Sequence, residues 1–194
     1  MNLDLPGLAA ARAVVLVEGT SDQAALEALA ERRGRALAAE GVVIVPMGGA
    51  TNIDHFLELL LGPGRTAVRL AGLCDAAEEG YFRRALERAG LGSRLSRAGM
   101  EALGFYVCAD DLEDELIRAL GVASVERVIE AQGEIRSFRI FQKQPAQQAN
   151  RPEQQLHRFL GTHSGRKSKY ARLLVGALDL AQIPRPLDRV LAHV

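Results

Sequence analysis

The chain has 194 residues, 48% of them hydrophobic, and its 24 Lys and Arg balance 24 Asp and Glu. This length and apolar content predict one domain with a sizeable core. The zero net charge excludes a global attraction to nucleic acid or anionic membrane, so any nucleic-acid contact must be local. Two cysteines, Cys74 and Cys108, are too few for a disulfide framework, and no signal-peptide pattern or membrane-length apolar run is visible. These features predict a cytoplasmic protein.

Four short apolar runs alternate with helical patterns in the first part of the chain. Buried strands that alternate with helices indicate βαβ crossovers and a parallel sheet. The sequence therefore predicts an α/β fold. The predicted strands are residues 13–17, 42–46, 66–74 and 104–108.

The first predicted helix runs from residue 22 to about 33, with Ser21 as its N-cap. A glycine turn at 47–50 leads to a second helix that Thr51 or Asn52 can cap, and residues 62–64 form a reversing turn. From residue 112 onward the pattern is almost entirely helical, apart from a loop or linker at 142–152. The chain is thus divided into an α/β core, residues 1–121, and a helical extension, residues 122–194. The helices predicted after the fourth strand are 112–120, 123–132, 134–144, 152–160, 166–180 and a short final helix.

Acidic side chains follow three of the four predicted strands. In open α/β sheets, ligands bind beyond the carboxyl ends of the strands. Carboxylates that converge there repel one another unless a cation is present, and their hard oxygens suit Mg²⁺ or Mn²⁺. The sequence therefore predicts a divalent-metal site. Its candidate residues are Glu18 and Asp22 after the first strand, Asp75, Glu78 and Glu79 after the third, and Asp110, Asp111, Glu113, Asp114 and Glu115 after the fourth.

Some of these acids have a simpler explanation. Asp and Glu in the first turn of a helix complement the helix dipole without any further function, and this reading is favoured for Glu79, Asp114 and Glu115. Glu18 precedes the helix in a Val-Glu-Gly turn, where capping does not explain it. Glu18 is therefore the strongest functional candidate.

The ordered motifs resemble a known family. VVLVEGTSDQAALEAL resembles the first motif of the topoisomerase–primase (TOPRIM) fold, and its Glu-Gly-x-x-Asp spacing is most similar to nucleases of the OLD (overcoming lysogenization defect) family. AGLCDAAEEGYF stands where that family carries Asp-x-Asp, DLEDEL resembles its acidic third motif, and GRKSKYARLL its terminal Lys-x-x-aromatic-Ala element. The resemblance covers residues 13–180. It implies a TOPRIM-like, Rossmannoid parallel sheet of about four strands, flanked by helices, with a C-terminal helical extension.

Residue by residue, the resemblance implies metal binding by Glu18, Asp22, Asp75 and Glu113, and places Lys167 near the scissile phosphate. The catalytic set is then Glu18, Asp75 and Lys167. The second Asp of Asp-x-Asp falls on Ala77, which cannot coordinate a metal, although Glu78 is a candidate substitute. This departure puts two-metal catalysis in doubt.

The function implied is that of an Mg²⁺- or Mn²⁺-dependent endonuclease that nicks or cleaves DNA. The resembled nucleases often carry this module behind an ATPase, so the domain is expected either to stand alone or to work with a separate ATPase partner. Two alternatives stay open: a non-catalytic TOPRIM-fold module that binds nucleic acid or a partner protein, favoured by Ala77, and an RNA-processing nuclease. A phosphoacceptor receiver-like domain would share the acidic strand ends, but the Glu-Gly turn and the helical tail argue against it.

A basic stretch lies in the helical extension. Between residues 134 and 172, nine Lys and Arg face only two acids, which suits phosphate binding but equally suits a solvated helical surface. His157 and His163 form no zinc pattern and are interpreted as surface or phosphate-contact histidines. The predicted nucleic-acid-binding residues are Arg136, Arg139, Lys143, Arg166, Lys167 and Lys169.

Overall fold

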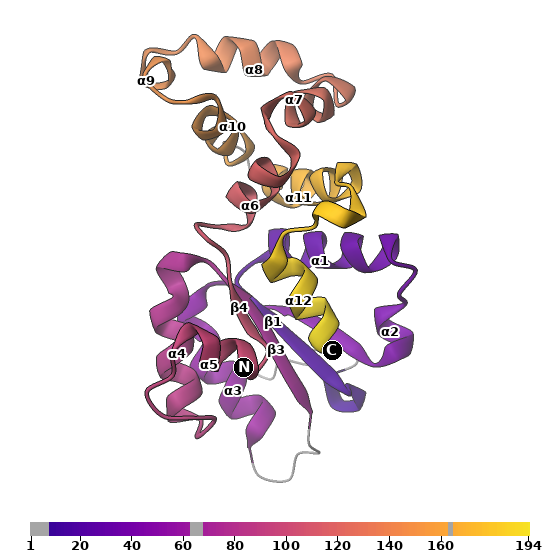
Figure 1. Cartoon of the computed structure of the whole chain (residues 1–194), viewed down its shortest axis with the longest axis vertical. Coiled ribbons are helices and arrows are strands. Elements are labelled where there is room, and N and C mark those ends of the chain that lie inside the picture. Colours follow the sequence, from indigo (N-terminus) through magenta and orange to yellow (C-terminus); the bar gives the residue numbers. More distant parts are fainter. Residues whose placement is uncertain (1–7, 63–67, 163–164) are drawn as a thin grey trace.

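A four-stranded parallel sheet of order β2-β1-β3-β4 lies at the centre of the computed structural model, which describes residues 8–62, 68–162 and 165–194 (Figure 1). Every residue of β1 is buried, as expected for a parallel strand covered on both faces. The α/β prediction is thus confirmed. The strands are β1 (Ala13–Val17), β2 (Val42–Pro46), β3 (Arg69–Cys74) and β4 (Phe105–Val107).

The predicted bounds of β1 and β2 match the structure, whereas β4 is shorter than predicted at both ends. The third strand was predicted from residue 66, and residues 66–67 lie outside the described residues, as do residues 63–64 of the predicted turn and His163. The chain runs from β1 outward to β2 and then crosses back to β3 on the other side of β1. The strand order therefore reverses between β1 and β3, where open sheets form their ligand crevice.

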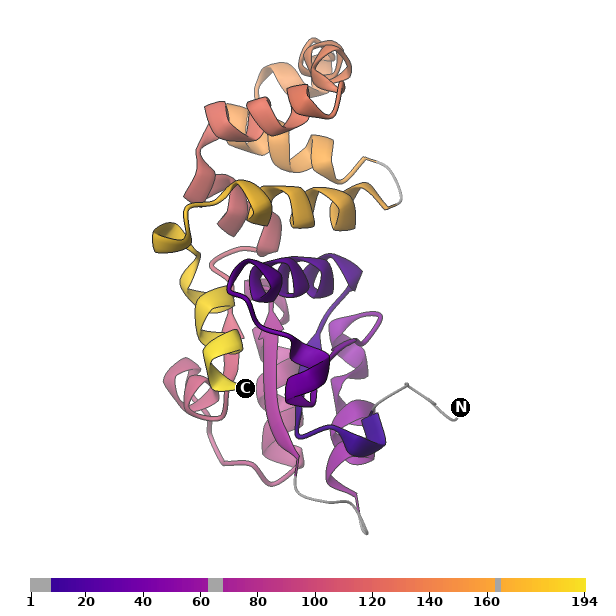
Figure 2. The ribbon, with the colours of Figure 1, turned by 90° about the vertical axis from the view of Figure 1, so that its right-hand side faces the viewer.

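Helices cover both faces of the sheet (Figure 2). The helices up to β4 are α1 (Thr20–Arg32), α2 (Leu37–Glu40), α3 (Ile53–Leu61), α4 (Glu79–Arg88) and α5 (Arg97–Ala102). Those after β4 are α6 (Leu112–Leu120), α7 (Val122–Ala131), α8 (Ile135–Gln142), α9 (Pro145–Gln148), α10 (Pro152–Leu160), α11 (Arg166–Ala177) and α12 (Arg185–His193). Short 3-10 helices are η1 (Leu8–Ala10), η2 (Ala50–Asn52), η3 (Ala76–Glu78) and η4 (Leu180–Gln182).

Two hydrophobic cores flank the sheet. Helices α3, α4 and α5 enclose one core, in which the rings of Phe82 and Phe105 meet edge to face. The other core joins the opposite face of the sheet to α1, α6 and most of the helical extension, and includes Phe138 and Tyr170. Among the described residues, no helix is long and apolar enough to cross a membrane.

The helices of the extension are not all equally distant from the sheet. Helix α11 packs along α1, and α12 packs against β3 and β4, whereas α7 to α10 gather beyond them at one end of the molecule (Figure 1). The chain thus leaves the core through α6 and returns to it through α11. The boundary predicted after residue 121 stays a prediction.

Two local predictions were wrong. The first helix starts at Thr20 with Gly19 as its N-cap, because the Asp22 carboxylate accepts the Gly19 N–H at 2.9 Å; Ser21 therefore lies inside the helix. Residues 142–152, predicted as a loop, contain α9, and Gln147 is buried there while its carbonyl oxygen accepts a bond from Gln155. Composition alone could not reveal this, since the amide partners come from the next helix.

Candidate metal centre

Glu18 directly follows β1 at the carboxyl edge of the sheet. Gly19 comes next, and Asp22 lies in the first turn of α1 with only 8% of its surface exposed. The Asp22 carboxylate therefore serves the helix start through Gly19 while it faces the same open cavity as Glu18. This cavity, of about 430 Å³, is called the carboxylate cavity below. Its lining comprises Glu18, Gly19, Thr20, Ser21, Asp22, Gly48, Gly49, Asp75, Leu112, Glu113 and Lys167.

A glycine turn after β2 forms one side of the carboxylate cavity. The N–H groups of Gly48 and Gly49 both donate to the backbone oxygen of Glu18 at 3.1 Å. Their φ angles of 73° and 125° lie in the region that favours glycine. The turn thus holds the backbone of Glu18 in place and leaves no side chain there to obstruct a ligand.

Asp75 follows β3 and lines the cavity. Glu78, the candidate substitute for the carboxylate missing at Ala77, does not line it. Ala77 is exposed, and Glu78 is half-buried outside the cavity lining. Glu78 lies close enough to Glu18 to contribute to raising the pKa of that carboxyl group. Glu78 is therefore beside the site rather than in it.

The acids after β4 divide into two kinds. Glu113 faces the carboxylate cavity from the first turn of α6. Asp114 and Glu115 instead form ion pairs with Arg118, at 3.1 and 2.9 Å, and Glu115 also accepts the Ala109 N–H. The local structural reading favoured for Asp114 and Glu115 agrees with these contacts, as it does for Glu79, which pairs with Arg97 at 2.6 Å.

Helix α11 brings Lys167 to the cavity from the far end of the sequence. Its Nζ lies 3.3 Å from Oε2 of Glu113, and the hydroxyl of the adjacent Ser168 meets that of Thr20 at 2.9 Å. Burial opposes the charge on Lys167, but Glu113 and the nearby Asp111 and Asp75 outweigh it and raise the pKa of the amine. Lys167 is therefore held as a cation among carboxylates.

Burial and mutual repulsion disfavour the ionised form of the carboxylates in the cavity. Burial, with repulsion from neighbouring carboxylates, raises the pKa of Asp75 to about 7; burial also raises that of Asp22 to about 6, aided by Glu113 and Glu18. Burial also raises the pKa of Glu18, despite the opposing charge of Lys167. Oε2 of Glu18 and Oε1 of Glu113 are buried without a hydrogen-bond partner among the described residues. Oxygen ligands that are crowded and unpartnered fit a hard divalent cation such as Mg²⁺ or Mn²⁺.

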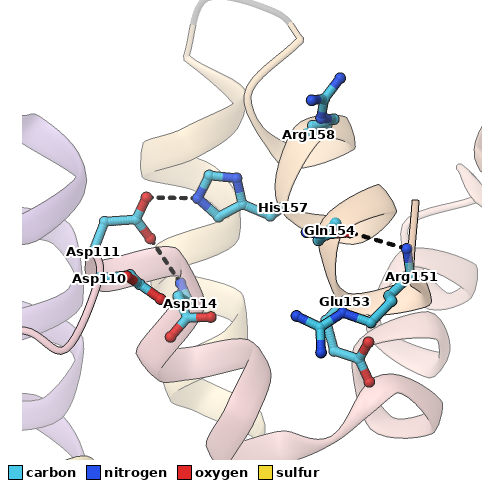
Figure 3. A pocket seen from close by; sticks show the side chains of 8 residues that line it. All are labelled: Asp110, Asp111, Asp114, Arg151, Glu153, Gln154, His157 and Arg158. Atoms are coloured by element: carbon cyan, nitrogen blue, oxygen red, sulfur yellow. Dashed lines mark hydrogen bonds and ion pairs between the residues drawn. The ribbon is translucent and has the colours of Figure 1, made fainter. Parts of the chain in front are cut away.

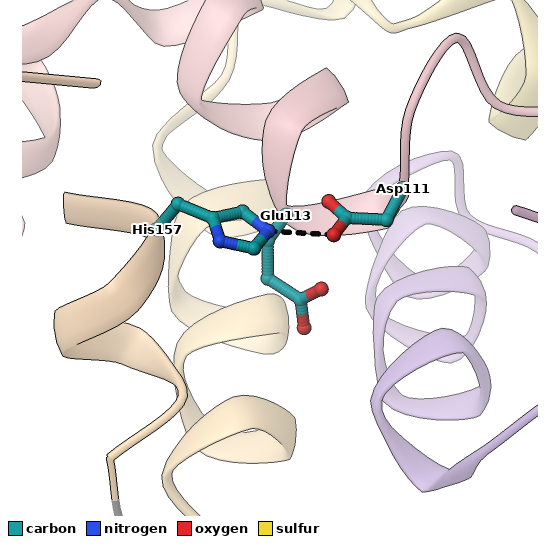
Figure 4. Close-up of side chains that lie close together, drawn as sticks. All are labelled: Asp111, Glu113 and His157. Carbon is teal, nitrogen blue, oxygen red and sulfur yellow. Dashed lines mark hydrogen bonds and ion pairs between the residues drawn. The ribbon is translucent and has the colours of Figure 1, made fainter. Parts of the chain in front are cut away.

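Sequence reasoning missed the role of His157. Its Nε2 lies 2.5 Å from Oδ2 of Asp111, and ligand atoms of Asp111, Glu113 and His157 all lie within 4.8 Å of one another (Figure 4). The side chain of His157 is 38% exposed, so its interpretation as a surface or phosphate-contact histidine stays a prediction, but its contact with Asp111 was not foreseen. No sequence signal could have found this pair, because 46 residues separate its members. A second cavity, of about 340 Å³, adjoins it (Figure 3), lined by Asp110, Asp111, Asp114, Arg151, Glu153, Gln154, His157 and Arg158.

Several of the predicted nucleic-acid-binding residues form ion pairs with acidic side chains. Arg139 pairs with Glu126 at 2.6 Å, and Arg166 and Lys169 both pair with Glu134. Arg136 and Lys143 are exposed on and just beyond α8. Lys167 is the member of this set that lines the carboxylate cavity.

Residues 11–75 match the model of the OLD-like TOPRIM domain, described as the overcoming lysogenization defect protein-like TOPRIM domain. The fold is similar to the C-terminal region of the OLD protein of Xanthomonas campestris pv. campestris, with a TM-score of 0.72 at 22% identity over 97% of this chain and 94% of that one. It is equally similar to the C-terminal region of the Burkholderia pseudomallei OLD protein, with a TM-score of 0.71 at 21% identity over 94% of this chain and 96% of that one.

Among curated proteins, no sequence match is found. The matched segment begins just before β1 and ends at Asp75, so it contains Glu18, Asp22 and the glycine turn. The likeness to the solved structures extends over nearly the whole chain and includes the helical extension. The chain therefore carries an OLD-like TOPRIM module on a fold shared with the C-terminal regions of OLD proteins.

Proposed function

We propose that the chain is a metal-dependent nuclease that hydrolyses phosphodiester bonds, with DNA as its substrate. The carrying observation is the carboxylate cavity, which Glu18, Asp75 and Glu113 line together with Lys167. Two carboxylate oxygens there are buried with no donor in the part of the chain that the structure describes. A divalent cation would relieve this repulsion, and the combination of metal and lysine suits the negative charge of a phosphodiester. The OLD-like TOPRIM match is consistent with this chemistry.

Each residue has a proposed task. Glu18 and Asp75 are assigned to one Mg²⁺ or Mn²⁺, and Asp22 and Glu113, which line the same cavity, to a second. A bound ion would polarise a phosphate oxygen and lower the pKa of a bound water. Lys167 offsets the charge that develops on the phosphate. The open backbone at Gly48 and Gly49 lets a phosphate approach closely.

The proposed activity is weak with Mg²⁺ because of Ala77. A methyl group there removes a carboxylate from the expected set, and Glu78 stands outside the cavity lining. Mn²⁺ binds most oxygen and nitrogen sites more tightly than Mg²⁺ and tolerates irregular geometry better. Mn²⁺ is therefore proposed as the better cofactor.

Ala77 also supports a second candidate, a non-catalytic module that binds nucleic acid or a partner protein. This candidate retains the fold and the glycine turn but has too few ligands for catalysis. RNA in place of DNA is the other alternative, and it differs from the proposal in substrate alone. An ATPase partner, expected from the sequence resemblance, and a cytoplasmic location complete the proposal.

The deciding experiment compares metal binding with cleavage. Mg²⁺ and Mn²⁺ are titrated by calorimetry into wild type, Ala77→Asp and Glu78→Gln, and each protein is assayed for nicking of supercoiled plasmid and for cleavage of a labelled RNA. We expect weak Mn²⁺-supported nicking in wild type. Ala77→Asp should raise Mg²⁺ affinity and activity together, by about 10-fold, the effect of about 1.4 kcal/mol.

The outcomes separate the candidates. If wild type binds no divalent metal while Ala77→Asp gains binding and cleavage, the natural chain is the non-catalytic module. If wild type cleaves RNA and leaves plasmid intact, the substrate assignment is wrong. If Glu78→Gln eliminates the wild-type activity, Glu78 has moved into the site and acts as the missing ligand.

A further inference from the structure

A nitrogen-containing cluster borders the carboxylate cavity. We propose that Asp111, Glu113 and His157 form a divalent-cation site whose imidazole ligand selects transition-metal ions over Mg²⁺. The inference deepens the proposed function by naming a metal ligand from the helical extension. It rests on the proposed function for what the bound ion does. The geometry itself is independent of any reaction.

The three side chains come from two elements that meet at one point (Figure 4). Asp111 is the N-cap of α6, Glu113 lies in the first turn of α6, and His157 projects from α10. Their ligand atoms lie within 4.8 Å of one another. Ligands that each lie about 2.0–2.2 Å from a shared metal are roughly 3–4 Å apart, so only a small adjustment is required.

Glu113 supplies a second, separate observation. Its side chain is only 6% exposed, and Oε1 is buried with no hydrogen-bond partner among the described residues. Its other oxygen faces Lys167 at the long distance of 3.3 Å. Buried carboxylate oxygens normally have a donor or a cation, so this oxygen is available as a ligand for a cation.

A purely structural role for the His157–Asp111 pair explains less. As a brace it would tie α10 to α6, but the buried side chains of Leu156, Phe159 and Leu160 already pack α10 into the core. Such a brace would also leave Oε1 of Glu113 without a partner. A cation shared by the three side chains would give that oxygen a partner. It would take the place of the hydrogen bond between His157 and Asp111 and separate the two ligand atoms slightly.

Solvent can reach the cluster. Asp111 and His157 line the second cavity (Figure 3), whereas Glu113 lines the carboxylate cavity. The cluster thus lies between two openings, which gives an ion a path of entry and places it beside Glu18 and Asp75.

The imidazole decides which ion is preferred. Mg²⁺ favours oxygen ligands, while Mn²⁺, Co²⁺ and Zn²⁺ accept imidazole nitrogen with affinities that rise along the transition series. The imidazole from α10 therefore adds one metal ligand, whereas Ala77 removes one carboxylate from the expected set. It also shifts the site away from Mg²⁺.

The test measures nitrogen coordination directly. Wild type, His157→Gln and the control His55→Gln are saturated with Mn²⁺ alone, and electron spin-echo modulation detects a ¹⁴N nucleus bound to the ion. His55 is exposed on α3 and serves as a matched control. We expect coupling to a directly bound nitrogen in wild type and His55→Gln, and its loss in His157→Gln. In calorimetry, His157→Gln should lower Zn²⁺ affinity about 10-fold or more and Mg²⁺ affinity less.

Absence of ¹⁴N coupling in wild type, its persistence in His157→Gln, or an equal fall in Zn²⁺ and Mg²⁺ affinity would overturn the inference. If His157→Gln folds poorly, wild type labelled with [¹⁵N]histidine decides: a ¹⁵N signal supports the site and an unchanged spectrum refutes it. Plasmid nicking is recorded in parallel. Cleavage without nitrogen coordination refutes this site and spares the nuclease; nitrogen coordination without cleavage supports the site and refutes the nuclease.

Discussion

Two sets of carboxylates lie a few residues apart and have different surroundings. Glu79, Asp114 and Glu115 form an outer set, in which each side chain pairs with an arginine. Glu18, Asp22, Asp75 and Glu113 form an inner set around the carboxylate cavity, where Lys167 is the one basic residue among the described residues of the lining. Glu113 and Asp114 are adjacent in sequence and belong to different sets.

The difference is one of neutralisation rather than residue type. Each outer carboxylate has an arginine partner, at 2.6 to 3.1 Å, so those acids need no further cation. The inner carboxylates share a partly buried space, where burial, together with repulsion from neighbouring carboxylates, raises the pKa of Asp75 to about 7. An acid-rich turn therefore indicates a metal site only where the fold does not pair its carboxylates with arginine side chains.

The largest expected effect comes from making the same Glu→Gln substitution in each of the two sets of carboxylates. Glu18→Gln should lower Mn²⁺-dependent nicking by about 100-fold or more and keep the fold, since it removes a ligand charge but keeps the side-chain shape. Glu79→Gln, the outer control, should retain activity within about twofold. Plasmid nicking rates with circular dichroism measure both. Wild-type rates in Glu18→Gln, or equal losses in the two variants, would remove the distinction between the sets.

Substitutions of basic side chains should have an intermediate effect on DNA binding and cleavage. Replacing Arg136, Arg139 and Lys143 together by alanine should weaken DNA binding about 10-fold and flatten its salt dependence, because each lost phosphate contact removes about 0.9 from the slope. Lys167→Ala, inside the cavity, should instead lower the cleavage rate more than the affinity. Fluorescence anisotropy at several salt concentrations measures binding. An unchanged slope in the triple variant would make that segment a solvated surface.

The smallest expected effect is on the stability of the metal-free protein. The pKa values of Asp22 and Asp75 are raised to about 6 and 7, so the native state retains protons that the unfolded chain has already released. The stability from these groups is therefore complete below about pH 4 and is lost as the pH rises through about 6 and 7.

In EDTA, wild type should therefore lose more thermal stability between pH 5 and 8 than Asp75→Asn does, because the amide cannot ionise. The expected difference in Tm is about 2–4 °C. Asp111 raises the pKa of His157, so this histidine also makes the stability depend on pH. Because both proteins contain the pair, its contribution cancels in the comparison. Parallel Tm curves in calorimetric scans would show that Asp75 is not electrostatically crowded.

Much of the fold was predictable because short-range pattern determines it. The fully buried run of β1 predicted a covered parallel strand, and the alternation with helices predicted the sheet. Parallel strands present their carboxyl ends at the same edge, so Glu18 and Asp75 could be expected to face one cavity. Helix starts were less predictable, because the N-cap at Gly19 depends on a side chain three residues away.

The amino-acid sequence by itself determined the α/β class, the acidic strand ends and the missing carboxylate at Ala77. Tertiary structure decided that Glu79 is neutralised, since Arg97 comes from another helix, whereas Asp114 pairs with Arg118 one turn further along the same helix. It also decided that His157 joins Asp111 and that Lys167 reaches Glu113 across 54 residues of chain. Pairings at such separations depend on how α10 and α11 pack on the core, and that packing is set by buried side chains rather than by the spacing of the site residues.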